Sequence, residues 1–247
     1  MSDEQFKQIV HIFRSEMSSP EDYPMVGVIS LSLSTILERI EFCLSLGISD
    51  FQLSFPCWGS LTDREVDIFF DEICGRFSEC RFLHYNLPRS QRVLTGADYA
   101  RISAAHPNFV AVKYGGADPD PQIRLEMLLN APELQFFFTE PGYASVRNEA
   151  ECGLLISTAS VNLSMAMTFF QARGDQLIRL REDIEKVHDT LLSAVGDAGH
   201  MDGVFDKILI KSHLPEFSLR LLPPYTSADD TCFDAFLSKV PMNWRPQ

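Results

Sequence analysis

Six short apolar runs, separated by stretches of helical periodicity, constrain this chain more than any other feature of its sequence. The runs occupy residues 25–31, 51–55, 81–85, 109–114, 134–138 and 153–157. Successive runs begin about 20–30 residues apart, which is the length of a β/α unit. Several are apolar without clean alternation, as expected for parallel strands that are covered on both faces. The pattern predicts an α/β fold in which parallel strands alternate with helices.

Capping residues mark the starts of the intervening helices. Ser2 with Gln5 and Thr62 with Glu65 each form a capping box ahead of an apolar stripe. Thr95 opens another helix, and residues 120–129 are expected to form the next. After residue 162 the pattern is helical alone, over residues 163–173, 177–195, 204–212 and 233–240. We therefore expect an incomplete β/α barrel over residues 1–162 and a helical C-terminal part over residues 163–247, packed as one domain.

Six strands leave two architectures open. A closed (β/α)8 barrel has eight strands, so the sequence describes either a barrel without its first units or an open, doubly wound sheet. A doubly wound nucleotide-binding sheet usually has a glycine-rich turn after its first strand. The sequence contains no GxGxxG or GxxxxGK[ST] motif, which favours the barrel, although periodicity alone does not decide.

Charge and cysteine pattern argue against several classes of protein. The net charge of −13, with 21 Lys and Arg against 34 Asp and Glu, repels phosphate backbones and so disfavours nucleic acid as a partner. No run approaches the roughly 20 apolar residues that span a bilayer. The six cysteines show no CxxC spacing and the histidines are scattered, so we predict no metal site. We expect a cytoplasmic protein with reduced thiols, no membrane contact and no organic cofactor.

Lys113 stands at the carboxyl end of the fourth apolar run and is followed by Gly115 and Gly116. Burial favours the neutral form of an amine, and a neutral amine can attack a carbonyl carbon to form a Schiff base. Two glycines at this point leave room for a ligand beside the backbone. A lysine that only packs its stem against the sheet and keeps its ammonium in water is the alternative.

Tyr85 ends the preceding run in the same way, in the sequence His-Tyr85-Asn-Leu-Pro. It precedes Lys113 by one β/α unit, so the two residues are expected on adjacent strands at the same rim. In β/α barrels the rim at the carboxyl ends of the strands is the one that carries the chemistry. A phenol beside an amine can donate and accept protons. A tyrosine that merely caps the core is the alternative here.

Tyr-Asn-Leu-Pro followed by Val-Ala-Val-Lys-Tyr resembles the paired signature of the dihydrodipicolinate synthase / N-acetylneuraminate lyase family. In that family a Y-N-x-P strand end carries the catalytic tyrosine, here Tyr85, and an I-K strand end carries the Schiff-base lysine, here Lys113. The segment that begins at Gly153 is similar to the family's G-x-I-S-x-x-A-N segment. The resemblance covers essentially the whole chain. It implies a (β/α)8 barrel, here N-terminally truncated to six recognisable strands and assembled as a dimer or tetramer.

The same resemblance implies substrate contacts. The backbone of Leu155, the second residue after Gly153, would contact pyruvate. Independently of the resemblance, the turn at Gly115 and Gly116 is expected to shape the pocket. Trp58 stands in Phe-Pro-Cys-Trp, which matches the family's T-P-Y-Y. The family has there a tyrosine of the proton relay, whereas tryptophan offers one N–H donor and cannot shuttle a proton. We therefore expect Trp58 to contact the substrate without taking part in proton transfer.

Two functional hypotheses follow. The first is a lyase or aldolase that acts on pyruvate or another 2-oxo acid through a Schiff base on Lys113, with Tyr85 moving protons and no cofactor. The second is a degenerate, non-catalytic relative that binds a 2-oxo acid or a partner subunit. The resemblance implies that two β/α units, with a carboxylate-holding turn, would precede residue 1, and their absence from this sequence favours the second hypothesis.

Overall fold

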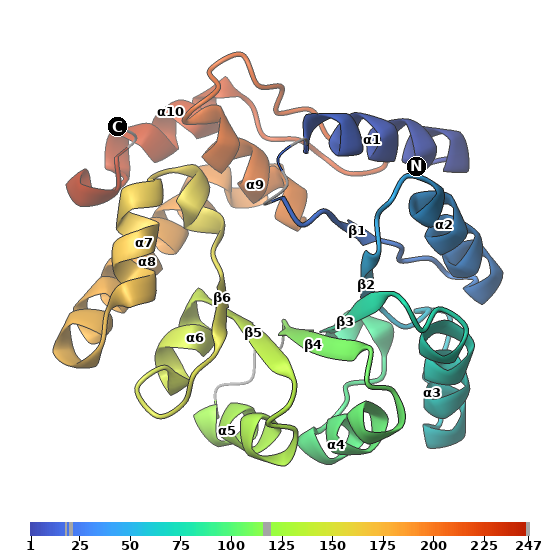
Figure 1. Ribbon diagram of the computed structural model, residues 1–247. Helices are drawn as coiled ribbons and strands as arrows, with labels where there is room; N and C mark the ends of the chain where they lie inside the picture. The colour runs from blue at the N-terminus through green and yellow to red at the C-terminus, as the bar shows by residue number, and fades with distance from the viewer. Residues whose placement is uncertain (18, 20–21, 116–119, 246–247) are drawn as a thin grey trace. The chain divides into compact units, whose positions relative to one another are not determined.

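The computed structural model describes residues 1–17, 19, 22–115 and 120–245 (Figure 1). The chain divides into two compact units, Met1–Phe138 and Thr139–Gln247. Each unit is described below by itself.

The first unit alternates helices and strands from its start. Its helices are α1 (Asp3–Glu16), α2 (Leu33–Ser45), α3 (Asp63–Phe70), α4 (Gly96–Ala105) and α5 (Pro121–Asn130). Its strands are β1 (Met25–Gly27), β2 (Asp50–Leu53), β3 (Arg81–Asn86), β4 (Phe109–Tyr114) and β5 (Gln135–Thr139), of which Thr139 is already the first residue of the second unit. A π-helical turn (Asp71–Gly75) continues α3, and a short 3₁₀ turn (Pro88–Ser90) follows β3.

The second unit contains one short strand and is otherwise helical. Its strand is β6 (Gly153–Leu155), and its helices are α6 (Glu140–Val146), α7 (Leu163–Gln171), α8 (Gly174–Val195), α9 (Asp202–Lys211) and α10 (Asp230–Lys239). The 3₁₀ turns lie at Ser157–Ser160, Gly196–Ala198 and Met242–Trp244. Every element after residue 162 that the structure describes is a helix or a helical turn.

Strand order decides between the two architectures that the sequence left open. Strands β1 to β5 are parallel and follow one another in chain order, each hydrogen-bonded to the next. Helices α2 to α5 lie along one side of these strands (Figure 1). A doubly wound sheet reverses its strand order and carries helices on both faces. The winding is therefore that of a β/α barrel, and the predicted six-strand α/β fold is confirmed.

The local signals for the helices are confirmed at three starts. Ser2 with Gln5, and Thr62 with Glu65, form complete capping boxes. The box at Thr95 is completed by Asp98. Helix α6 was not predicted, because its first residues, Glu-Pro-Gly, are typical of a turn. Proline is also favoured in the first turn of a helix, and here it stands there.

Aromatic side chains fill the space between the strands and helices of the first unit. Phe55 contacts Phe70 and His84, and Tyr99 contacts Phe109 and Phe136. All of these side chains are at most 2% exposed. Full burial of such a ring contributes about 1.5–3 kcal/mol to folding. The apolar strands therefore form the core.

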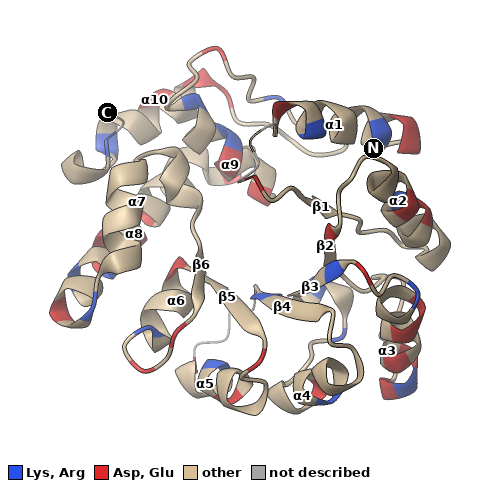
Figure 2. Ribbon diagram, in the orientation of Figure 1, with Lys and Arg blue, Asp and Glu red and all other residues tan. Residues whose placement is uncertain are grey.

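Charged residues lie mainly on the outer helices. Both acidic and basic residues lie along α8 (Figure 2), where Arg181 pairs with Glu185 and Lys186 with Asp183. Among the described residues, no helix has both the length and the apolar character that crossing a membrane requires. The boundary predicted at residue 162, between an incomplete barrel and a helical C-terminal part of the same domain, stays a prediction.

Candidate functional site

Strands β3 and β4 place Tyr85 directly opposite Lys113. The pairing contains an irregularity: Phe82 faces Phe109, but the next residue, Leu83, faces Ala111. Val110 is thus an extra residue on β4, in the manner of a β-bulge. Because successive side chains on a strand point to opposite faces, one extra residue turns the rest of β4 over. Without it, Lys113 would lie opposite Asn86 and on the other face.

The Lys113 ammonium lies over the face of the Tyr85 ring, with Nζ 4.0 Å from the ring centroid. Both residues are half-buried. A cation over an aromatic face gains roughly 0.5–2 kcal/mol, depending on how far it is desolvated. The Tyr85 ring therefore holds the Lys113 amine at the strand ends. The hydroxyl group of Tyr85 is carried on the ring that the amine contacts. Lys113 and Tyr85, the two residues predicted to carry the chemistry, are thus in contact in the structure.

Gly115 completes this group. A Cβ atom on residue 115 would lie 2.8 Å from Cε2 and 3.2 Å from the hydroxyl oxygen of Tyr85. Carbon atoms in contact are normally about 3.5–4.0 Å apart. A side chain at this position would thus displace the Tyr85 ring, and glycine is the residue that permits the observed arrangement. Gly116, predicted to line the pocket with Gly115, lies outside the described residues.

Asn86 anchors the loop that follows Tyr85. Its side-chain Nδ2 donates to the Leu94 carbonyl oxygen at 2.8 Å, and its Oδ1 accepts from the Leu94 amide at 3.0 Å. Its backbone oxygen accepts from the Gly115 amide at 3.1 Å. Asn86 is fully buried, so these bonds are protected from water. Through its side chain and its backbone oxygen, Asn86 thus ties the loop, the end of β3 and the end of β4 together.

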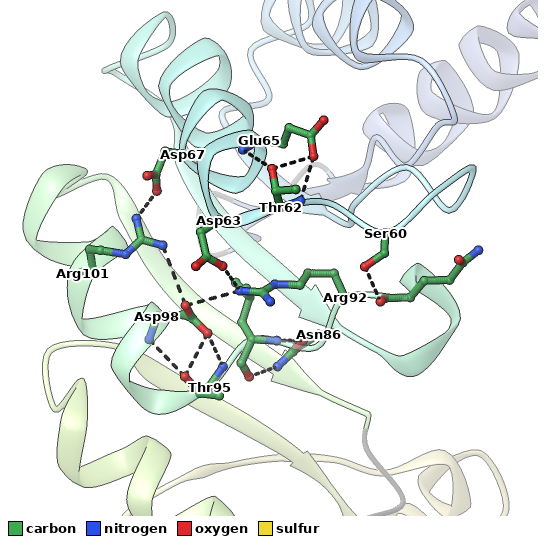
Figure 3. Close-up of polar contacts among 12 residues, drawn as sticks. Ser60, Thr62, Asp63, Glu65, Asp67, Asn86, Arg92, Thr95, Asp98 and Arg101 are labelled. Carbon is green, nitrogen blue, oxygen red and sulfur yellow. Dashed lines mark hydrogen bonds and ion pairs between the residues drawn. The ribbon is translucent and has the colours of Figure 1, made fainter.

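Ion pairs hold the outer side of the same loop (Figure 3). Arg92 forms a hydrogen bond to Asp63 at the start of α3 and lies 3.7 Å from Asp98 in the first turn of α4. Arg101 pairs with Asp67 and also approaches Asp98. We call the contacts of Asn86 and of Arg92 the loop clamp. Sequence reasoning missed the loop clamp, and the only local signal for it was the Asn that follows Tyr85.

His84, the neighbour of Tyr85 on β3, points to the opposite face and belongs to the core. Its Nδ1 lies 2.9 Å from the Tyr99 hydroxyl, and the ring is fully buried. Burial lowers the pKa of His84 to about 3, because the charged imidazolium loses its hydration. A histidine that stays neutral in this way is not available for proton transfer near neutral pH.

Two further predicted residues stand on other elements. Trp58 is 87% exposed in the loop after β2. Leu155 ends β6 in the second unit, where the following backbone is fixed by the buried Glu140, whose Oε1 accepts from the Ser157 amide at 2.9 Å. The substrate contacts assigned to Trp58 and Leu155 stay predictions.

Comparisons with known proteins identify the fold. No family model and no curated protein sequence matches this chain. Solved structures match over nearly its whole length, among them dihydrodipicolinate synthase family proteins, N-acetylneuraminate lyases and a sialic acid aldolase. The predicted resemblance is therefore confirmed for the fold, a (β/α)8-type barrel fold with six strands in the part that the structure describes.

Three of these structures define the likeness. Dihydrodipicolinate synthase from Bacteroides thetaiotaomicron is 15% identical with a TM-score of 0.83, and the match covers 97% of this chain and 81% of that one. A prophage protein of the dihydrodipicolinic acid synthase family from E. coli K12, in complex with pyruvate, is 12% identical with a TM-score of 0.81 and coverages of 96% and 80%. A catalytic lysine mutant of sialic acid aldolase from Ruminococcus gnavus is 16% identical with a TM-score of 0.78 and coverages of 96% and 78%.

Proposed function

We propose that this protein is a lyase or aldolase that acts on pyruvate or another 2-oxo acid through a Schiff base on Lys113. The observation that carries the proposal is the position of the Lys113 ammonium, 4.0 Å from the centroid of the Tyr85 ring, at the carboxyl ends of two adjacent parallel strands. In β/α barrels, catalytic residues come from these strand ends. The pyruvate complex of the E. coli structure and the catalytic lysine of the Ruminococcus gnavus enzyme support the same assignment.

The proposed chemistry begins with the neutral amine of Lys113. Its nitrogen lone pair attacks the C2 carbonyl carbon of the 2-oxo acid, and the carbonyl oxygen takes up a proton. Loss of that oxygen as water leaves a cationic imine between C2 and Nζ. The imine accepts the electron pair when C3 loses a proton, or when the bond from C3 to an aldehyde carbon breaks. Protonation of the resulting enamine at C3 restores the imine, and hydrolysis of the imine returns the free lysine and the 2-oxo acid.

Tyr85 serves as the proton donor and acceptor in this scheme. A phenol can donate to the departing hydroxyl and then accept from the substrate as a phenolate, which is general acid–base catalysis. Lys113 and Tyr85 lie on one face of the sheet in paired register, so both act on the same bound molecule. Gly115 leaves the space in which the Tyr85 ring stands. The loop clamp fixes the backbone on either side of the pair.

Borohydride reduction in the presence of pyruvate tests the proposal. Reduction converts the imine into a stable secondary amine, which peptide mass mapping locates. We expect one adduct, on Lys113, in the wild type and none in Lys113→Arg. Tyr85→Phe keeps the ring beneath the amine and removes only the hydroxyl, so it should still give the adduct, but more slowly, while losing turnover. A folded wild-type sample without an adduct, beside a pyruvate aldolase that is labelled, would rule the proposal out.

A second candidate function is favoured by the exposure of Trp58. A tryptophan side chain that is 87% exposed is typical of a protein–protein contact, since tryptophan is enriched at the centres of interfaces. In this alternative the protein binds a 2-oxo acid or a partner subunit, a second copy of itself included, without turnover. Absence of the adduct together with a Trp58-dependent change of oligomeric state, measured by analytical ultracentrifugation of wild type and Trp58→Ser, would favour it.

A further inference from the structure

A pocket of about 280 Å³ opens between α4 and α5 in the first unit. Its lining consists of the end of the clamped loop, the start of α4, the last residue of β4 and one side of α5: Val93, Leu94, Thr95, Gly96, Tyr114, Ile123, Glu126 and Met127. Tyr114 follows Lys113 on β4, and successive side chains of a strand point to opposite faces. The pocket therefore lies on the helix side of the sheet, away from the face that carries Lys113 and Tyr85.

The pocket has an apolar floor and a more accessible rim. Leu94, Tyr114 and Met127 are at most 4% exposed, and they form the inner wall. Val93 and Glu126 are exposed and belong to the mouth. A dry cavity of about 150 Å³ is large enough for benzene, so this pocket has room for a single aromatic ring with a short chain.

The walls are fixed before any ligand arrives. Asn86 holds Leu94 through two buried hydrogen bonds. The start of α4 approaches α5 closely, because a Cβ on Gly96 would lie 2.9 Å from the Glu126 carbonyl oxygen and 3.0 Å from the Met127 Cα. Binding to a preformed pocket avoids the entropy cost of ordering its walls. The pocket is thus a built feature of the α4–α5 contact.

The charge at the pocket and on the whole protein indicates which class of ligand the pocket would bind. Among the described residues that line the pocket, Glu126 is the one that carries a charge, and the protein as a whole carries a net charge of −13. Both disfavour an anion and favour an ammonium group at the mouth. We propose that this pocket is a ligand site, separate from the Lys113–Tyr85 pair, for a small amine with an apolar ring or chain. The apolar part occupies the space above Leu94 and Met127, and the ammonium lies toward Glu126.

Titration of the ¹⁵N-labelled full-length protein with 2-phenylethylamine tests the site by NMR. We expect saturable shifts of the Gly96, Tyr114 and Met127 amides, with a dissociation constant in the millimolar range for a ligand of this size. The matched probe is 3-phenylpropionate, which has the same ring and the opposite charge. It should bind at least about fivefold more weakly, because it loses the attraction to Glu126 and gains a repulsion.

Three variants make the test specific. Glu126→Gln should weaken the amine about two- to fivefold, as expected for an exposed ion pair, and should reduce its advantage over the acid. Glu72→Gln removes an exposed charge that does not line the pocket, and it should leave the amine affinity unchanged. Ile123→Trp should fill the space and abolish the localised shifts.

Two results would overturn the proposal. One is a set of diffuse shifts, or none, at the pocket amides up to the solubility limit of the amine. The other is equal binding of the amine and the acid in the wild type. Neither result involves Lys113 or a 2-oxo acid, so a failure here leaves the proposed function to its own test.

Discussion

Gly115→Ala should displace the Tyr85 ring and so disturb its pairing with Lys113. The new methyl carbon would lie 2.8 Å from Cε2 and 3.2 Å from the hydroxyl oxygen of Tyr85. Relief to a normal contact of about 3.5 Å requires a movement of roughly 0.7 Å. Since the Gly115 amide is bonded to the Asn86 carbonyl, the backbone is restrained, and the ring takes up most of the movement.

The expected loss of activity is large compared with the loss of stability. A misplacement of about 1 Å in a reacting group can cost about 100-fold in rate. Overpacking by one methyl group costs about 1–3 kcal/mol in the free energy of unfolding, which most domains survive with a stability of about 5–15 kcal/mol. We therefore expect a folded variant whose catalytic rate is reduced about 100-fold.

Hydrogen–deuterium exchange at the pyruvate methyl group measures this rate without knowledge of the second substrate. Formation of the imine acidifies the C3 protons, so their replacement by deuterium in D₂O, followed by proton NMR, reports both steps that involve Lys113 and Tyr85. Gly75→Ala is the matched control, because a Cβ at residue 75 meets no atom within 4 Å. It should retain the wild-type exchange rate.

Retention of the wild-type exchange rate in Gly115→Ala, in a sample that is folded by circular dichroism, would refute this reasoning. An equal loss in Gly75→Ala would also refute it, since that would make the effect a general response to alanine. A crystal structure of Gly115→Ala would show whether the Tyr85 ring has moved.

Three further predictions concern stability and reactivity. Asn86→Ala leaves the buried Leu94 amide and carbonyl without their partner and should lower the free energy of unfolding by about 2–4 kcal/mol in urea titrations. Burial lowers the pKa of His84 to about 3, whereas a histidine in the unfolded chain has a pKa of about 6.5. Between these two pH values the unfolded chain binds a proton that the folded protein does not bind. The free energy of unfolding should therefore fall by up to about 5 kcal/mol as the pH decreases from about 6.5 to 3. Cys57 is exposed, whereas Cys74 is buried and its pKa is raised to about 12, so an aromatic disulfide reagent should label Cys57 in the native protein and Cys74 only after unfolding.

Each of these three predictions has a control or a result that would contradict it. Arg89→Ala, at an exposed position of the same loop, should leave the urea midpoint nearly unchanged, and equal losses in it and Asn86→Ala would contradict the role of the buried amide. His84→Leu should flatten the acid slope, and an unchanged slope would assign the slope to other groups. Labelling of Cys74 at the rate of Cys57 would show that the core around α3 opens readily.

The sequence predicted the elements and the ends of strands well, because those depend on local patterns. The alternation of apolar runs placed the six strands of the described residues, and capping residues located the starts of three helices. Tyr85 and Lys113 were assigned to adjacent strand ends from their position after apolar runs, and they are register partners. Periodicity left the strand order open, since order depends on contacts between units far apart in the chain.

What sequence reasoning missed is long-range geometry of single residues. The loop clamp needs Asn86 to reach Leu94 and Arg92 to reach Asp63, and no local pattern predicts either distance. The extra residue Val110 on β4 has no signature in the sequence either, because an apolar strand with a bulge has the same kind of residues as one without a bulge. Yet this residue determines that Lys113 faces the same side as Tyr85, so the candidate site depends on a feature that periodicity does not reveal.

The contact between amine and ring has a consequence for the proposed chemistry. A cation–π contact stabilises the ammonium form of Lys113, whereas attack on a ketone needs the neutral amine. The two requirements are compatible when Tyr85 is in its phenolate form, because its oxygen then accepts a proton from the ammonium and becomes a phenol, while Nζ becomes a neutral amine. Transfer to the phenolate form removes the charge on Nζ and frees its lone pair at the site of attack. On this argument Tyr85→Phe, which keeps the ring and loses the acceptor, slows formation of the imine more steeply at neutral pH than at alkaline pH, where bulk hydroxide can remove the proton.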